Sequence, residues 1–125
     1  MAEYKAHDPS TSDHTGYAGM SFFSDDGGYS WQASSNTVDM YPIEVQEADA
    51  VELKDGRIMM FARSYHGHPV RAYSADRGAT WSKGELMKEL EMPIAGMPSV
   101  RRIPVTGDLL FVWISEESVD KSNPN

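Results

Sequence analysis

Glu47 and Arg63 are the two residues whose types and spacing most suggest chemistry. They lie 16 positions apart, around a segment that reads as strand, Asp55-Gly56 turn and strand. A hairpin over this segment brings Glu47, before its first strand, and Arg63, at the end of its second, to the same end. A carboxylate can accept a proton there, and a guanidinium can bind another carboxylate through two parallel hydrogen bonds. Without a function, Glu47 would be a solvated carboxylate in a loop, and Arg63 would form a salt bridge at the end of its strand.

A second polar cluster follows in His66-Gly67-His68. Two histidines could form half of a metal site, but the sequence places no third ligand nearby. We therefore predict no metal and no other cofactor, and we assign His66 and His68 to a polar loop.

The composition argues against several classes of function. The 125 residues carry a net charge of −8 and no cysteine. This charge disfavours non-specific nucleic-acid binding and anchoring on anionic lipid, and the lack of cysteine removes disulfides and thiolate metal sites. No apolar run approaches the length of a membrane-spanning helix, and Met1 to Gly19 has no apolar core like that of a secretory signal. We expect no nucleic-acid or membrane partner and leave the compartment unassigned.

The elements that must position these residues follow from an internal repeat. The octapeptides Ser24–Trp31 and Ser74–Trp81 both read S-x-D-x-G-x-[S/T]-W and lie 50 residues apart. Two hairpins with the turn dipeptides Asp55-Gly56 and Gly107-Asp108 alternate with them, and their glycines lie 51 residues apart. Both repeats therefore share one period, which contains four strands.

Four strands in a repeat of this length are typical of a β-propeller. We predict an all-β protein of antiparallel four-stranded blades, about two of them in this chain. With the strands of one blade called A to D, the chain runs C-D, A-B-C-D, A-B over residues 17–114. Residues 1–16 are expected to form an N-terminal tail or loop, and residues 115–125 a truncated C-terminal loop.

The two octapeptides resemble the Asp-box, or BNR repeat, of sialidases and related propellers. In that family the motif is structural and lies away from the active face. Its glycine can adopt a positive φ, its aspartate can accept backbone N–H groups, and its tryptophan can be buried between blades. We therefore expect Trp31 and Trp81 to be buried. The residues assigned to the fold are Ser24, Asp26, Gly28, Trp31, Ser74, Asp76, Gly78 and Trp81.

Residues 47–64 resemble the blade of bacterial exo-sialidases that reads roughly E-x-x-x-V-E-L-x-D-G-x-[L/M]-x-x-x-x-R-S. In that family the glutamate partners a tyrosine nucleophile, and the arginine is one of three that bind the carboxylate of sialic acid. The resemblance assigns these roles to Glu47 and Arg63, and allows His66 and His68 to contact the glycan. It implies that Glu47 and Arg63 face one solvent-accessible end of the middle blade, opposite the octapeptide turns. No residue of this chain matches the tyrosine, the aspartate acid/base or the other two arginines.

Three functions remain open. The resemblance implies part of a sialidase-like glycoside hydrolase that cleaves terminal sialic acid or a related sugar, with a sialoside as its partner. A carbohydrate-binding propeller without catalysis is the second possibility, so the sequence does not decide whether the protein is an enzyme. The third is a self-assembling unit, in which strands A-B of one copy complete C-D of the next and three copies form six blades.

Overall fold

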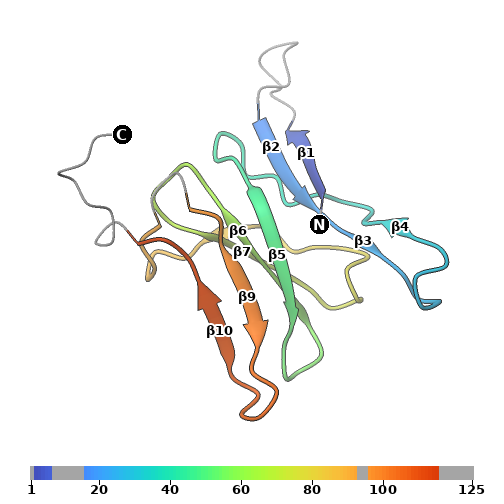
Figure 1. The fold of residues 1–125 in the computed structure, drawn as a ribbon. Helices are drawn as coiled ribbons and strands as arrows, with labels where there is room; N and C mark the ends of the chain where they lie inside the picture. The colour runs from blue at the N-terminus through green and yellow to red at the C-terminus, as the bar shows by residue number, and fades with distance from the viewer. Residues whose placement is uncertain (1, 7–15, 93–95, 116–125) are drawn as a thin grey trace.

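The computed structural model describes residues 2–6, 16–92 and 96–115, and Figure 1 shows their arrangement. Ten strands and no helix occur in these residues, and every strand pair is antiparallel. The all-β class predicted from the repeats is therefore confirmed.

A four-stranded sheet forms the centre of the chain. Its strands, which follow one another in space as in sequence, are β5 (Gln46–Glu52), β6 (Ile58–Arg63), β7 (Val70–Ser74) and β8 (Glu85–Leu86). Between β5 and β6, Gly56 takes a φ of 85°, which glycine adopts without a steric penalty. The apolar run at 59–62 in β6 is buried, because its side chains alternate between the two faces of the sheet and other segments pack on both faces. This sheet is the A-B-C-D unit that the sequence predicts.

Two smaller parts flank the central sheet (Figure 1). On one side, β9 (Ser99–Arg102) pairs with β10 (Leu109–Val112), and β9 contacts β5. On the other side, β3 (Phe22–Phe23) pairs with β4 (Gln32–Ala33). These strand pairs occupy the places of the predicted A-B and C-D ends.

The N-terminal segment differs from the prediction of a tail or loop over residues 1–16. Residues 2–6 form β1 (Ala2–Ala6), which pairs with β2 (Gly16–Met20) along its whole length. The prediction of a tail or loop rested on the Asp, Ser and Pro residues at positions 8–13. That composition carries no information about the short strand that precedes them. Residues 116–125 of the predicted C-terminal loop lie outside the described residues.

Two hydrophobic clusters lie on the two faces of the central sheet. The first joins Met60 and Ala62 of β6 to Val38, Val45 and Trp81. The second joins the other face of β6 to the β9–β10 pair, where the rings of Phe61 and Phe111 meet edge to face with centroids 4.9 Å apart. Because side chains alternate along β6, one strand supplies both clusters.

The two octapeptides form turns with the same internal hydrogen bonds, and we call them the first turn motif (Ser24–Trp31) and the second turn motif (Ser74–Trp81). In each, the serine Oγ accepts the glycine N–H at 2.8 Å and donates to the aspartate at 2.8 Å. The aspartate also accepts a backbone N–H and a hydroxyl from the residue before the tryptophan, at 2.6 to 2.9 Å. Gly28 and Gly78 share a φ of 95°. Equivalent sequences therefore fold into equivalent local structures.

The predicted burial of both indoles is correct for Trp81 and wrong for Trp31. Trp81 is 6% exposed, donates its indole N–H to Ser21 Oγ, and is held by two hydrogen bonds with the Asn36 side-chain amide. Trp31 is 62% exposed and donates only to Gly28 O within its own turn. The difference arises because the chain segment containing Ser21 and Asn36 covers the second motif, whereas no described element covers the first.

Candidate functional site

Glu47 lies on a β-bulge at the start of β5. Gln46 is opposite Arg63 and Asp49 is opposite Phe61, so two residues of β5 face one residue of β6. Glu47 has a φ of 48°, in the left-handed region that residues with a Cβ rarely adopt. A bulge redirects a side chain, and strained backbone of this kind gathers at functional sites. Here the bulge places the Glu47 carboxylate against the end of β6.

The guanidinium of Arg63 is the centre of the resulting cluster. Its Nη1 lies 3.0 Å from Glu47 Oε2, and its Nη2 donates to Gln46 Oε1 and, at 3.2 Å, to Tyr65 Oη. The guanidinium also stacks over the Tyr65 ring, 5.2 Å from its centroid. The side chains of Arg63 and Glu47 are 12% and 30% exposed, so solvent reaches the pair from one side.

The strand register places this cluster at the predicted end of the sheet. Arg63 ends β6, while Ile58 begins it and is paired with Ser74, the first residue of the second turn motif. The cluster and the second turn motif therefore lie at opposite ends of β6. The predicted placement of Glu47 and Arg63 is confirmed, whereas their roles in binding or catalysis stay predictions.

The two histidines occupy the loop that follows the cluster. The His66 side chain is exposed, and the backbone N–H of His66 donates to Ser64 Oγ. His68 is half-buried, with Nδ1 2.8 Å from Leu90 O. Within the described part of the chain, no group of three or more potential ligands could hold a metal ion. Contact of either histidine with a glycan remains a prediction.

Sequence reasoning missed three members of the cluster: Glu44, Gln46 and Tyr65. Gln46 is 6% exposed, and its Nε2 donates to Glu44 Oε2 at 2.6 Å while its Oε1 accepts from Arg63. A buried amide thus links a second carboxylate to the guanidinium. The regular register of the hairpin, with Asp49 opposite Phe61, would set Glu47 opposite Arg63, and only the bulge brings Gln46 there, so the sequence carried no signal for this contact.

Asp49 ties the central sheet to the β9–β10 pair. Its Oδ2 accepts the Ser99 hydroxyl at 2.9 Å and the Val100 N–H at 3.0 Å, and it forms an ion pair with Arg101. Burial favours a higher pKa for this carboxyl, but the hydrogen bonds from Val100, Ser99 and Ala50 and the contact with Arg101 bring the pKa below its ordinary value. Asp49 therefore stays ionised and holds two sheets together.

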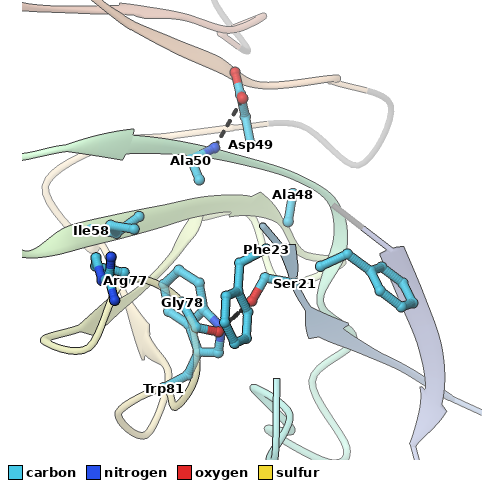
Figure 2. Close-up of a pocket in the computed structure, with 10 residues that line it drawn as sticks. Ser21, Phe23, Ala48, Asp49, Ala50, Ile58, Arg77, Gly78 and Trp81 are labelled. Carbon is cyan, nitrogen blue, oxygen red and sulfur yellow. Dashed lines mark hydrogen bonds between the residues drawn. The ribbon is translucent and has the colours of Figure 1, made fainter. Parts of the chain in front are cut away.

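A pocket of about 250 Å³ lies between β3 and the central sheet (Figure 2). It is lined by Ser21, Phe22, Phe23, Ala48, Asp49, Ala50, Ile58, Arg77, Gly78 and Trp81. Among the lining residues, the Ser21 hydroxyl donates to Gly78 O at 2.7 Å and accepts the indole N–H of Trp81 at 2.9 Å (Figure 2). Its lining is polar and apolar in nearly equal parts, and it shares no residue with the Glu47–Arg63 cluster.

This fold and site define an all-β protein of repeated antiparallel sheets, with a turn motif at one end of the central sheet and a glutamate–arginine ion pair at the other. The family model described as a BNR repeat-like domain matches residues 6–102. The chain therefore belongs to the BNR repeat-like domain family, and the resemblance to the sialidase superfamily is confirmed. No protein with a curated description matches the chain.

Solved structures show where this fold occurs in larger proteins. A Dyadobacter fermentans protein of unknown function is 25% identical, with a TM-score of 0.57 over 71% of this chain and 24% of its own. The NanB sialidase of Streptococcus pneumoniae is 26% identical, with a TM-score of 0.54 over 75% of this chain and 15% of its own. A second NanB structure, with Optactamide, is 25% identical, with a TM-score of 0.56 over 78% and 16%. The sialidase neighbours give the β-propeller fold, and the chain spans a quarter or less of each of these proteins.

In the described residues, no helix is long and apolar enough to cross a membrane.

Proposed function

We propose that this chain is part of a sialidase-like glycoside hydrolase, in which it supplies one wall of a site for terminal sialic acid or a related sugar. The observation that carries the proposal is the Glu47–Arg63 ion pair, which a strained bulge holds at the end of the sheet opposite the second turn motif. The likeness to NanB sialidase supports it. On this proposal the turn motifs are Asp-boxes, and the complete propeller has six blades.

Each residue of the cluster has a part in the proposed chemistry. Arg63 binds the carboxylate of the sugar, because a guanidinium forms two parallel charge-assisted hydrogen bonds with it. Glu47 accepts the proton of a tyrosine nucleophile that this chain does not supply, since a neutral tyrosine attacks poorly unless a base removes its proton. His66 and His68 lie in the adjoining loop and contact the glycan.

Glycan binding without catalysis is the second candidate, and the contacts of Arg63 favour it. Glu47, Gln46 and Tyr65 already occupy both terminal nitrogens of the guanidinium. Glu47 is therefore engaged as the counter-ion of Arg63 and is not free to act as a base, which favours a role in binding over a role in catalysis. Hydrolysis of a fluorogenic sialoside by the protein that contains this chain separates the two candidates, since a binding module gives no product.

The variant Arg63→Ala, made in the protein that contains this chain, tests the sugar binding that both candidate functions require. We expect the affinity for sialic acid, measured by NMR titration, to fall roughly 10- to 150-fold, as for a lost charge-assisted hydrogen bond of about 1.5–3 kcal/mol. Arg57→Ala is the matched control, because Arg57 is an arginine at the other end of the same hairpin, paired with Asp55 at 2.8 Å. Equal affinity in the wild type and Arg63→Ala would show that Arg63 only stabilises the strand end.

A further inference from the structure

The contacts of Arg63 decide how a carboxylate can reach its guanidinium. A guanidinium has two edges that bind a carboxylate through two parallel hydrogen bonds, and both edges include Nη2, one with Nε and the other with Nη1. In Arg63, Nη2 already donates to Gln46 Oε1 and, at 3.2 Å, to Tyr65 Oη. Because Nη2 carries two N–H groups, these two acceptors use both of them. A carboxylate can therefore form two parallel hydrogen bonds with Arg63 only after Gln46 or Tyr65 leaves Nη2.

Gln46 is the acceptor that stays. It is 6% exposed, and its Nε2 donates to Glu44 Oε2 at 2.6 Å. Because a carboxylate only accepts hydrogen bonds, Glu44 fixes the amide with its nitrogen toward Glu44 and its oxygen toward Arg63. Separation from Arg63 would leave a buried carbonyl oxygen without a donor, at the full cost of its desolvation. Gln46 is therefore a fixed support of the guanidinium.

Tyr65 is the acceptor that can leave. It is 41% exposed, and its hydrogen bond with Arg63 lies in solvent, so water can replace the guanidinium at little cost. The backbone around Tyr65 is held by Ser64, whose hydroxyl donates to His68 O at 2.6 Å and accepts the His66 N–H at 3.1 Å. Rotation of the Tyr65 side chain, without movement of the loop, is therefore enough to free Nη2.

On the basis of the proposed function, we infer that Tyr65 is a displaceable side chain that occupies, in the free site, the place of one oxygen of the sugar carboxylate on Arg63. Binding of the sugar replaces a neutral phenol oxygen by a charged oxygen, which forms the stronger hydrogen bond. The guanidinium keeps its position during this exchange, because Gln46 and Glu47 continue to hold it. The cost of displacing Tyr65 is part of the measured affinity, so Tyr65 weakens the binding of the ligand of its own site.

Tyr65→Phe, made in the protein that contains this chain, removes the competing oxygen and keeps the ring that lies 5.2 Å from the guanidinium. We expect the affinity for sialic acid, measured by NMR titration, to rise roughly 2- to 10-fold, as for one hydrogen bond to a neutral acceptor. A rise in affinity cannot result from partial unfolding of the variant.

Tyr73→Phe is the matched control for this measurement. The Tyr73 ring lies under the guanidinium of Arg57, 4.8 Å from it, as the Tyr65 ring lies under that of Arg63. Tyr73 belongs to the same sheet but precedes the second turn motif, at the end away from the cluster. Tyr73→Phe should therefore bind sialic acid as the wild type does.

A crystal structure of the complex with sialic acid tests the exchange directly. We expect both carboxylate oxygens on the Arg63 guanidinium, Gln46 in place, and the Tyr65 hydroxyl beyond hydrogen-bond distance of Nη2. A carboxylate bound through two hydrogen bonds while Tyr65 still accepts from Nη2 would overturn the inference.

The titrations separate failure of this inference from failure of the proposed function. If neither the wild type nor Tyr65→Phe binds sialic acid, the proposed function is wrong and the inference is wrong with it. If the wild type binds and Tyr65→Phe binds equally or more weakly, only the inference is overturned, and weaker binding would show that the Tyr65 hydroxyl contacts the sugar. Binding by Tyr65→Phe alone would support both.

Discussion

At the scale of single residues, Glu47 combines a strained backbone conformation with an ion pair at the end of the sheet. Its backbone is in the left-handed region, at a φ of 48°, and its carboxylate forms the ion pair with Arg63. A residue with a Cβ pays a steric penalty in that region, so the surrounding bulge must hold it there. The strained backbone at Glu47 therefore positions the carboxylate beside Arg63 and lowers the local stability of the fold.

Glycine and alanine at position 47 isolate this backbone strain. Both variants lose the ion pair with Arg63, so their difference reports the backbone alone. We expect Glu47→Gly to be more stable than Glu47→Ala by about 1 kcal/mol in urea unfolding, because only glycine adopts a positive φ freely.

Ala50→Gly provides the control for that comparison, since position 50 lies in the same strand without a positive φ. Glycine there should destabilise the chain by about 0.5–1 kcal/mol, the usual cost in a strand. If alanine proves equal to or better than glycine at position 47, the strain at Glu47 is absent.

At the scale of elements, the turn motifs depend on ionised aspartates. Hydrogen bonds from the Thr80 hydroxyl and N–H and from the Ser74 hydroxyl lower the pKa of Asp76 from 3.8 to about 2. The equivalent bonds from Ser30 and Ser24 hold the pKa of Asp26 well below its ordinary value. Each carboxylate gathers the donors of its turn, so the charged form stabilises the local fold.

These pKa values predict a window of acid sensitivity. The folded pKa of Asp76 is depressed, so its stabilising contribution is complete above the ordinary value of 3.8 and is lost as the pH falls toward about 2. Asp76→Asn should lower the urea midpoint at neutral pH. As the pH falls from 3.8 to about 2, the free energy of unfolding of this variant should decrease less than that of the wild type. Denaturation at several pH values measures this difference, and parallel pH profiles for the two proteins would contradict it.

The elements could be predicted because their signals are local. The turn motif and the Asp55-Gly56 hairpin specify their own geometry through glycines and short side-chain hydrogen bonds. The bulge at Glu47 carries no such signal, since glutamate has no preference for a positive φ. β1 was missed although Ala2–Ala6 alternates apolar and polar residues as a strand does, because the turn-forming residues that follow it outweighed this short signal.

At the scale of the whole molecule, contacts between sheets rest on few polar residues. Asp49 receives the Ser99 hydroxyl and the Val100 N–H, and it contacts Arg101. These bonds join β5 to β9 beside the apolar contact of Phe61 with Phe111. The position of the β9–β10 pair therefore depends on Asp49 as well as on apolar packing.

Replacement of Asp49 should loosen the β9–β10 pair selectively. We expect Asp49→Ala to destabilise the chain by about 1–3 kcal/mol, because the Ser99 and Val100 donors lose their acceptor. Hydrogen exchange should accelerate in residues 99–102 and 109–112 more than in β6 and β7. Glu89→Ala is the control, since Glu89 forms an exposed pair with Arg71 that should contribute about 0–1 kcal/mol. Uniform exchange changes throughout the chain would show that Asp49 does not act at this interface.

The sequence by itself determined the repeat, the all-β class, the order of the strands from 17 to 114 and the placement of Glu47 and Arg63 at one sheet end. These properties follow from turn residues and strand alternation, which act over a few neighbouring residues. Only the tertiary structure decided that Trp81 is buried and Trp31 exposed, although their motifs are alike. It also decided that Gln46 and Tyr65 join the Arg63 cluster. Burial and side-chain contact depend on which distant segment lies alongside, and identical local motifs carry no information about their neighbours.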